Sequence, residues 1–439
     1  MPHNAASPGP RRSSLIAALQ PDARQALERI VSAAGDAAVY VVGGALRDAL
    51  LGRPITDLDL AVEGDAAALA ARAIRGARVI AHPRFLTASL HAGSVRIDLA
   101  TCRRETYPHP GALPRVAPAD IESDLRRRDF TINATALRLN GAAALIDPCG
   151  GQRDLQAGIV RVLHDRSFID DPTRVFRAFR YAARLGFRVH PATRALLPTG
   201  VASIPRLSGE RLRRELELTF GEEHAGEALE DAQDCGALAA IHHALAWDPR
   251  RTAGFASLRR LVPADPFGFA LLAAKATPPD AESLVRRLRL KRAETDAVRG
   301  LAALAGAAAT LTRRSAKPSG VVLLLDRSPP ASVAAFAAVC SDTIAAQIAL
   351  RYLEEWRYVK PHLNGRDLTR LGVPEGPHVQ RGLHLIRAAR LDGWASDRGD
   401  EEALVLRFAK SIRDSGRRQG AGVSAEAREL SPHHRRNGS

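Results

Sequence analysis

Apolar and polar residues alternate along the chain in two different ways, and the change falls near residue 150. Before it, short runs rich in Val, Ile and Leu are separated by stretches whose apolar residues recur at helical spacing. The predicted elements are a helix at 23–34 and strands at 38–42, 57–62 and 94–100. Strands that alternate with helices are typical of an α/β domain, which we place at residues 22–150.

The remainder of the chain is predicted to be helical. From Leu155 onward strand signals fade, and long stretches show the helical period. The clearest predicted helices are 172–185, 209–220, 283–309 and 379–391. We divide this all-α part into residues 151–220 and 221–414. The segments 1–21 and 415–439 are poor in aromatic residues and rich in Pro, Ser, Gly or Arg, so we expect them to be disordered.

The charge of the chain narrows the class of partner. Lysine and arginine number 63 against 48 aspartates and glutamates, which gives a net charge of +15 and favours a polyanion. No apolar run in the sequence approaches the roughly 20 residues that span a bilayer, so we expect nucleic acid and no membrane. The cysteines are scattered, and residues 1–14 lack the apolar stretch of a secretory signal. A cytoplasmic protein without an obligate protein partner is the simplest expectation.

A glycine pair follows the first predicted strand. The missing Cβ atoms of Gly43 and Gly44 allow a tight turn and a close approach of the backbone. A helix beginning near Ala45 would point free N–H groups at a phosphate, and Arg47 in its first turn could bind the same anion. A Gly-Gly pair is common without any ligand, so phosphate binding is a hypothesis at this point.

Two aspartates lie on the next predicted strand. Asp57 and Asp59 alternate with leucines, so both carboxylates face one side, about 7 Å apart at Cα. Converging carboxylates repel unless cations lie between them, and hard oxygen ligands suit Mg²⁺. Asp98, in the alternating segment 95–100, could complete a metal-binding triad from a neighbouring strand. The alternative is that all three are ordinary surface residues.

The start of the predicted helix 172–185 carries a possible base-selecting pair. Asp171 and Arg174 place an acceptor beside a forked donor. Cytosine and adenine each present an amino donor next to a ring-nitrogen acceptor, whereas guanine and uracil present the opposite arrangement. The pair could therefore select C and A together, and Arg177 and Arg180 add cations along the helix. The alternative is a salt bridge between Asp171 and Arg174 on a solvated helix.

Taken in order, these segments resemble the motifs of the bacterial class II tRNA nucleotidyltransferase and poly(A) polymerase family, within the wider DNA polymerase β-like superfamily. The motifs are GGALRD (43–48), DLDL (57–60), IDLATCRRETY (97–107), RRDFTINA (127–134), IDPCGGQRDL (146–155), DDPTRVFRAFRYAARLGF (170–187) and SGERLRREL (208–216). The resemblance implies an α/β nucleotidyltransferase head of the polymerase β type at 22–150, followed by an all-α neck at 151–220 and an all-α body and tail at 221–414.

The resemblance also implies roles for individual residues. The catalytic residues would be Asp57 and Asp59, which would hold Mg²⁺, and Asp98, which would activate the 3′-hydroxyl of the RNA. The triphosphate and sugar of the nucleotide would be bound by Gly44, Arg47, Arg128, Asp129 and Asn133. Asp171 and Arg174 would act as a protein template for the base, and Arg177 and Arg180 would also bind nucleotide.

Some features depart from the family pattern or extend it. Asp170 stands where the family usually has Glu, and Leu86 where related sequences often have Gly. The segment between Asp98 and Arg127 looks like an intact flexible loop of the sort associated with the switch from C to A addition. Residues 362–393 resemble the tail that grips tRNA in long relatives, although an ordinary helical hairpin would fit them equally well.

The function implied is the addition of CCA to the 3′ end of tRNA from CTP and ATP. Within the same fold, an A-adding tRNA nucleotidyltransferase or a poly(A) polymerase is the alternative. A non-catalytic RNA-binding protein would be expected to have lost the metal-binding carboxylates, all of which are present. An enzyme that modifies small molecules or proteins would need the paired aspartates but neither the template pair nor a basic helical tail.

Overall fold

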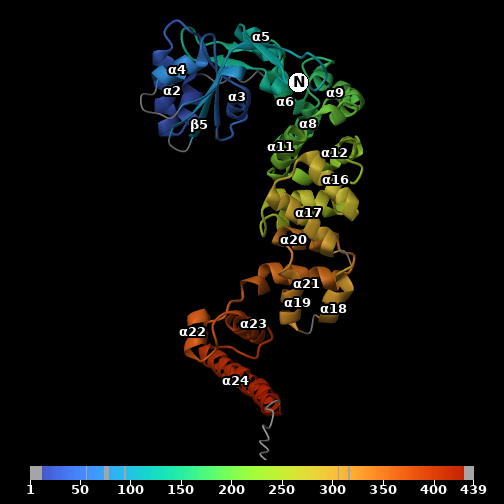
Figure 1. Ribbon diagram of the computed structural model, residues 1–439. Coiled ribbons are helices and arrows are strands. Elements are labelled where there is room, and N and C mark those ends of the chain that lie inside the picture. The colour runs from blue at the N-terminus through green and yellow to red at the C-terminus, as the bar shows by residue number, and fades with distance from the viewer. Residues whose placement is uncertain are drawn as a thin grey trace, which may run out of the picture. The chain divides into compact units, whose positions relative to one another are not determined.

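The computed structural model describes residues 12–55, 57–73, 79–92, 95–304, 306–314 and 317–429 (Figure 1). The chain forms two compact units. The first is Met1–Ala256 with Lys275–Lys291, and the second is Ser257–Ala274 with Arg292–Ser439. All the strands found among the described residues belong to the first unit, and the described part of the second unit is helical.

A seven-stranded mixed sheet in the order β3-β4-β5-β2-β1-β8-β9 forms the head. Its strands are β1 (Val39–Val42), β2 (Asp57–Val62), β3 (Ile80–His82), β4 (Thr87–Ala92), β5 (Val95–Thr101), β8 (Ala136–Arg138) and β9 (Leu145–Ile146). β2 and β5 run parallel, and the other neighbouring strands run antiparallel. The strands predicted from the sequence are β1, β2 and β5, which form the centre of this sheet. The α/β fold class is confirmed.

Helices cover the sheet and bury its apolar residues. The helices of the head are α1 (Arg12–Ala18), α2 (Pro21–Ala33), α3 (Gly43–Leu50), α4 (Ala66–Ala73) and α5 (Ile121–Arg126). α2 and α4 pack against each other and against β4 and β5. Leu58 and Leu60 of β2 are buried in the resulting core. Because side chains alternate along a strand, Asp57 and Asp59 lie on the opposite face.

The expectation of disorder at 1–21 is wrong for the part of this segment that the structure describes. Residues 12–18 form α1, and Leu15 and Leu19 are buried in the same core as the sheet. Two leucines at helical spacing can bury an apolar face even where the overall composition is polar. Residues 1–11 lie outside the described part of the chain.

Two small pairs of strands were not predicted. The segment expected to be a flexible loop contains the antiparallel hairpin β6 (Arg103–Thr106) and β7 (Arg115–Pro118). In the part predicted to be all-α, β10 (Ile159–Val160) and β11 (Arg188–Val189) form a parallel pair. Strands of two residues are too short to show a period in the sequence.

Several helices follow the head. Those within the predicted neck include α6 (Gly151–Gln156), α7 (Ser167–Asp170), α8 (Thr173–Leu185) and α11 (Gly209–Phe220), and α12 (Ala225–Asp234) comes after it. α8 packs against both α11 and α12 and ends at Gly186, whose φ of +70° gives a left-handed cap. The predicted helices 172–185 and 209–220 therefore correspond to α8 and α11 within one residue.

The predicted helix 283–309 is wrong as a single element. α16 (Pro278–Leu288) ends at Arg289, whose φ is +50°, and α17 (Arg292–Leu304) begins three residues later. A non-glycine residue in the left-handed region stops an α-helix. Apolar periodicity alone does not show this break, because both helices have an apolar face.

The second unit consists of packed helices (Figure 1). They are α15 (Ala264–Leu272), α17, α18 (Ala308–Arg314), α19 (Pro318–Leu325), α20 (Pro330–Val339), α21 (Thr343–Glu354), α22 (Gly365–Arg370), α23 (Pro377–Leu391) and α24 (Arg398–Glu429). α24 continues into the segment from residue 415 that we expected to be disordered, and residues 430–439 lie outside the described part. Among the described helices, no single one is long and apolar enough to span a membrane. α19 and α20 reach that length and apolar composition only together, and the pair is bent by 110°.

Candidate active site

A cavity of about 390 Å³ lies within the first unit, beside the glycine turn and α8. The predicted site residues that line it are Gly44, Asp59, Arg128, Asp129, Asn133, Asp171, Arg174 and Arg177. Gly43, the other glycine of the predicted turn, also lines it, together with residues that were not predicted: Phe85, Arg103, Glu105, Tyr107, Pro114, Arg127 and Tyr181. Four described residues that were predicted for the site do not line this cavity: Asp57, Asp98, Arg47 and Arg180. The volume is in the range of small-molecule sites.

The glycine turn forms one wall of this cavity. α3 begins at Gly43 itself, two residues earlier than the sequence predicted. Gly43 has a φ of +65°, and a Cβ there would lie 3.0 Å from Nη1 of Arg128 and 3.5 Å from Oδ2 of Asp59. Glycine is therefore needed at position 43 both for the backbone conformation and for the close approach of these two side chains.

Gly43→Ala is expected to lower the rate of the reaction in this cavity about 10- to 100-fold, because displacement of reacting groups by about 1 Å has effects of that size. The added methyl group would push the Arg128 guanidinium away from the turn. Gly35→Ala is the matched control, since Gly35 has a φ of +59° but no atom within 4 Å of the place that its methyl group would take. Equal losses in the two variants, measured as initial rates at matched folded fraction, would show that backbone strain alone is responsible.

The three predicted carboxylates lie on two adjacent parallel strands. Asp59 of β2 is paired in register with Asp98 of β5, so the third carboxylate is next to the pair as the sequence suggested. Asp57 is exposed, whereas Asp59 is half-buried. Burial raises the pKa of Asp59 above its usual value, the Arg128 guanidinium opposes this, and the charges of Asp98 and Asp57 add to the rise. A bound cation would relieve the repulsion among these carboxylates.

Asp98 is held by partners on its own side of the sheet. Its Oδ1 accepts hydrogen bonds from Oγ of Ser89 (2.5 Å) and Nε of Arg96 (3.0 Å), and Oδ2 lies 2.9 Å from Nη2 of Arg96. Among the described residues, the three carboxylates do not form a group whose oxygens all lie within 4.8 Å of one another. Arg96 thus neutralises Asp98 on the face that it shares with Asp59. The residue types fit a hard divalent cation.

Arg47 is a buried structural side chain rather than a wall of the cavity. It is 2% exposed, forms a two-pronged ion pair with Asp48, and donates from Nη1 to Oδ1 of Asn133 at 2.8 Å. Its guanidinium also lies 5.2 Å from the ring centre of Tyr181. Arg47 therefore orients Asn133, and it reaches the cavity through that residue.

Asp129 connects the head to the neck. Its Oδ1 accepts from the amide of Asn133, and its Oδ2 accepts from Nε of Arg177 on α8 at 3.0 Å. Burial alone would raise the pKa of Asp129, but the Arg177 guanidinium and the Asn133 amide together hold it well below its usual range. Asp129 is therefore ionised at any working pH and fixes Arg177 at the edge of the cavity.

Asp171 and Arg174 do not neutralise each other. Within the described residues, no ion pair links them, which removes the alternative of a self-contained salt bridge. Arg174 is 5% exposed and donates from Nη1 to Oγ of Ser167 (2.6 Å) and from Nη2 to the carbonyl of Arg127 (2.9 Å). Asp171 pairs with Arg211 of α11 at 2.7 Å. Both side chains are thus held by third residues while lining the cavity.

Arg180 is buried away from the cavity. It is 4% exposed and pairs with Glu215 of α11 at 3.2 Å and with Glu222 at 3.8 Å. Tyr181, the next residue, does line the cavity, with Arg47, Arg177 and Arg180 each within 5.5 Å of its ring centre. Tyr181 is therefore a wall of the cavity that three guanidinium groups contact, and Arg180 supplies one of them.

Arg180→Ala is expected to lower the free energy of unfolding by about 3 kcal/mol, because it leaves Glu215 and Glu222 buried with weaker compensation. The KM for nucleotide should change little in the fraction that stays folded. Denaturant unfolding and steady-state kinetics together test this. Arg194→Ala is the control, since Arg194 forms an exposed pair with Asp231 and should cost less than about 1 kcal/mol. A stable variant with a strongly raised KM would instead mean that Arg180 contacts the nucleotide.

A polar network on the hairpin was missed in the sequence. Glu105 accepts from Nη1 of Arg127 (2.7 Å) and from the hydroxyl of Tyr107 (2.9 Å), and it pairs with Arg103 at 3.3 Å. Burial and the adjacent Glu105 raise the pKa of Tyr107, so this hydroxyl stays protonated and donating. Arg103, Glu105 and Tyr107 recur every second residue, and this period would have placed them on one face of a strand.

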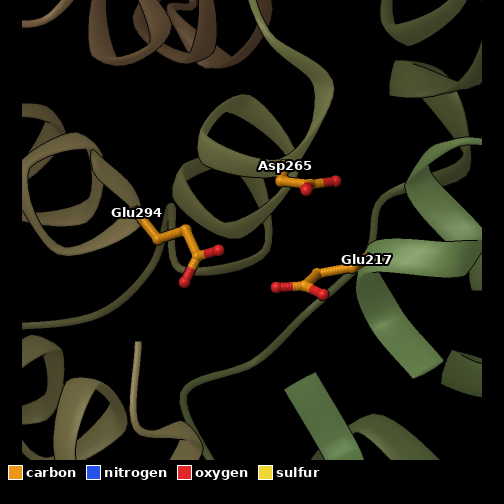
Figure 2. Close-up of side chains that lie close together, drawn as sticks. All are labelled: Glu217, Asp265 and Glu294. Carbon is orange, nitrogen blue, oxygen red and sulfur yellow. The ribbon is translucent and has the colours of Figure 1, made fainter. Parts of the chain in front are cut away.

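Three further acidic side chains are drawn in Figure 2. Glu217 comes from α11 of the first unit, whereas Asp265 and Glu294 come from α15 and α17 of the second. Glu217 accepts from Nζ of Lys291 at 2.6 Å and lies 3.4 Å from Arg213, both in its own unit. Basic partners thus already balance its charge, and the carboxylates of the head remain the candidates for binding a metal.

Comparison with known proteins agrees with this geometry. The family model described as "Poly A polymerase head domain" matches residues 39–161, and that described as "Probable RNA and SrmB- binding site of polymerase A" matches residues 186–247. A mixed sheet with paired aspartates, a glycine turn and a helical neck defines a nucleotidyltransferase of the polymerase type. With the similarities that follow, the chain belongs to the class II tRNA nucleotidyltransferase family.

Two relatives carry the family assignment. The CC-adding tRNA nucleotidyltransferase of Deinococcus radiodurans is 35% identical over 411 residues, which are 91% of this chain and 96% of that protein. The A-adding tRNA nucleotidyltransferase of Geobacter sulfurreducens is 34% identical over 403 residues, which are 85% of this chain but 45% of that protein. The chain thus spans less than half the length of the Geobacter relative.

Solved structures of the family match over almost their whole length. A CCA-adding enzyme in an apo form has a TM-score of 0.74 and 30% identity, over 90% of this chain and 98% of that chain. The Thermotoga maritima CCA-adding enzyme complexed with tRNA has a TM-score of 0.72 and 29% identity, over 92% and 99%. CCA-adding enzymes with CTP and with ATP have TM-scores of 0.71, each over 91% of this chain and 98% of their own.

Proposed function

We propose that this protein adds C and A nucleotides from CTP and ATP to the 3′ end of tRNA and so completes the CCA terminus. The observation that carries the proposal is the shared cavity of Asp59, Asp171 and Arg174. It combines a carboxylate suited to a metal with an acceptor and a donor that are not paired to each other. An acceptor beside a donor is complementary to the edge common to C and A.

In this proposal the residues of the head handle the triphosphate. Asp57 and Asp59 would hold Mg²⁺, which neutralises phosphate charge and favours ionisation of an attacking hydroxyl. Asp98 would take the proton of the RNA 3′-hydroxyl. The turn at Gly44 and the guanidinium of Arg128 would bind the phosphates, and pyrophosphate would leave as the new phosphodiester forms.

The remaining residues of the cavity would bind the rest of the nucleotide. Asn133, which is oriented by Arg47 and donates a hydrogen bond to Asp129, would contact the sugar. Arg177, fixed by Asp129, would also contact the nucleotide. Asp171 and Arg174 would read the base, with Tyr181 as the wall beside it.

Transfer RNA is proposed as the acceptor because of charge and family likeness. The net charge of +15 favours a polyanion, and phosphate contacts dominate the affinity of proteins for nucleic acids. A similar structure is a CCA-adding enzyme complexed with tRNA. The basic helical segment at 362–393, which includes α22 and α23, is the proposed tail contact.

Addition of A alone is the second candidate, because the Geobacter relative and an Aquifex aeolicus relative that is 42% identical over 229 residues are both A-adding enzymes. The two candidates and a poly(A) polymerase differ in their products. Purified protein should be incubated with tRNA lacking CCA, with tRNA ending in CC, and with an unstructured RNA, each with single nucleotides.

The length of the products distinguishes the candidates. We expect extension of tRNA lacking CCA with CTP, extension of tRNA ending in CC by one residue with ATP, and little extension of the unstructured RNA. Extension of only the CC-ending tRNA would mean an A-adding enzyme. An open-ended ladder on the unstructured RNA would mean a poly(A) polymerase.

A further inference from the structure

We propose that Arg211 is a positioning residue that couples the turn of the β6–β7 hairpin to the choice of base at Asp171. The proposal deepens the proposed function, on which it rests. Arg211 does not line the cavity among the described residues, and neither the charge of the chain nor the helical period singled it out. It lies in the first turn of α11, and its backbone N–H donates to the side chain of the capping residue Ser208.

One guanidinium connects two separate elements. Nη2 of Arg211 donates to Oδ1 of Asp171 at 2.7 Å, and Nη1 donates to the carbonyl oxygen of Gly111 at 2.9 Å. Gly111 lies in the connection between β6 and β7, whereas Asp171 lies two residues before the start of the neck helix α8. The side chains of Arg211 and Asp171 are only 24% and 20% exposed, so water screens this pair weakly.

The contacts of Asp171 show which of its oxygens can read a base. Oδ1 accepts from Arg211 and also from the backbone N–H (3.0 Å) and the hydroxyl (2.6 Å) of Thr173. Among the residues that the structure describes, Oδ2 has no such donor. Saturation of Oδ1 leaves Oδ2 as the acceptor for the exocyclic amine of C or A. Thr173 is a neighbour in the chain, so Arg211 is the contact that can transmit a change from elsewhere.

The hairpin turn packs against the same region independently of this hydrogen bond. Gly111 has a φ of +74°, and a Cβ there would lie 3.6 Å from Leu207 and 3.9 Å from Pro172. Pro172 follows Asp171 directly, and Leu207 precedes the cap of α11. The hairpin also contributes Tyr107 and Pro114 to the cavity. A shift of the hairpin would therefore change both the shape of the cavity and the support of the base-reading carboxylate.

The first test measures base selectivity in Arg211→Gln. Ratios of kcat/KM for CTP over UTP and for ATP over GTP should fall about tenfold, the effect of losing one charge-assisted hydrogen bond. The loss should appear mainly in KM for CTP and ATP. Arg211→Lys, which keeps the charge but not the fork, should restore part of the ratio. Unchanged ratios in both variants, with only a lower melting temperature, would overturn the proposal.

The second test addresses the coupling to the hairpin. Gly111→Ala strains the turn and displaces its carbonyl. It should therefore also lower the ratios of kcat/KM for CTP over UTP and for ATP over GTP. The double variant with Arg211→Gln should be no less selective than Arg211→Gln alone, whereas additive losses would show that the two sites act separately. Arg214→Gln is the control on the same helix, because Arg214 is 66% exposed and should leave the ratios unchanged.

Nucleotide binding separates this proposal from the proposed function. Calorimetry with CTP and with UTP gives a ratio of dissociation constants without any RNA, in the wild type and in Arg211→Gln. A wild type that prefers CTP but extends no tRNA would contradict the proposed function only. A preference for CTP that Arg211→Gln retains in full would contradict the role of Arg211, whatever the protein does to tRNA.

Discussion

Asp59→Asn is expected to reduce nucleotide incorporation at least about 1000-fold, because a metal ion supplies several kcal/mol of stabilisation and each ~1.4 kcal/mol corresponds to tenfold in rate. The amide has almost the shape of the carboxylate but lacks its charge, so the cavity should be kept. The stability of the folded state should not decrease. Burial raises the pKa of Asp59, and the charges of Asp98 and Asp57 add to the rise, so a neutral side chain is favoured at this position.

The sign of the stability effect can be checked separately. An acid whose pKa is raised by folding destabilises the native state when it is ionised, at pH values above its folded pKa. Without added metal at neutral pH, Asp59→Asn should therefore melt no lower than the wild type. Asp36→Asn, at an exposed position of the head, is the control for both measurements. Substantial incorporation by a folded Asp59→Asn protein would remove Asp59 from the catalytic site.

Asp171→Asn is expected to lower kcat/KM for CTP and ATP about 100-fold or more while raising the relative use of UTP and GTP, since unpaired polar groups in a site cost about that much. The direction follows from the contacts of Oδ1. Thr173 and Arg211 both donate to that oxygen, so the amide oxygen of the variant should take its place. The amide NH₂ would then face the base, where C and A also present a donor but U and G present an acceptor.

The measurement is single-nucleotide incorporation on the same tRNA with each of the four nucleotides. Asp165→Asn, at an exposed position a few residues earlier, controls for the loss of a negative charge near the neck. Equal losses for all four nucleotides would mean that Asp171 supports the fold of the cavity without reading the base. Full retention of the preference for C and A would assign base selection to other residues.

The sequence predicted the carboxylate part of the site well because strands have a period of two. The alternation in 57–62 and 95–100 placed Leu58, Leu60 and Leu99 inside, so the intervening aspartates had to share the other face. The in-register pairing of Asp59 with Asp98 needed the strand order, in which β2 and β5 are neighbours although α4, β3 and β4 lie between them in the chain. The order of strands in a sheet cannot be deduced from the pattern of residues within any one strand.

The neck helix shows where spacing misleads. Residues three apart on an α-helix are rotated by about 60° from one another, so Arg180 lies about 120° around the helix from Arg174 and cannot share its face. The structure buries Arg180 against Glu215 for this reason. Tyr181, seven residues after Arg174, returns to within about 20° of its direction and lines the cavity. Adding about 100° for each residue from Arg174 would have predicted that Tyr181 lines the cavity and that Arg180 does not.

Contacts between elements distant in sequence account for the other differences. The phosphate contact expected of Arg47 stays a prediction; its guanidinium lies beside the Gly44 turn, and Asn133 and Tyr181, which come from later segments, also contact it. Leu86, at a position where related sequences often have Gly, does adopt a φ of +54°, so the turn keeps the left-handed conformation without glycine. Neither the burial of a side chain nor a tolerated backbone strain can be deduced from residue type alone.

The most direct test of the proposed function is the 3′-terminal sequence of tRNA lacking CCA after incubation with the wild-type protein, Mg²⁺ and all four nucleoside triphosphates. The proposed function predicts products that end in CCA and stop there, and the acceptor and donor of Asp171 and Arg174 predict that UTP and GTP are left unused. Unextended tRNA, or tails that contain U or G as often as C and A, would contradict the account.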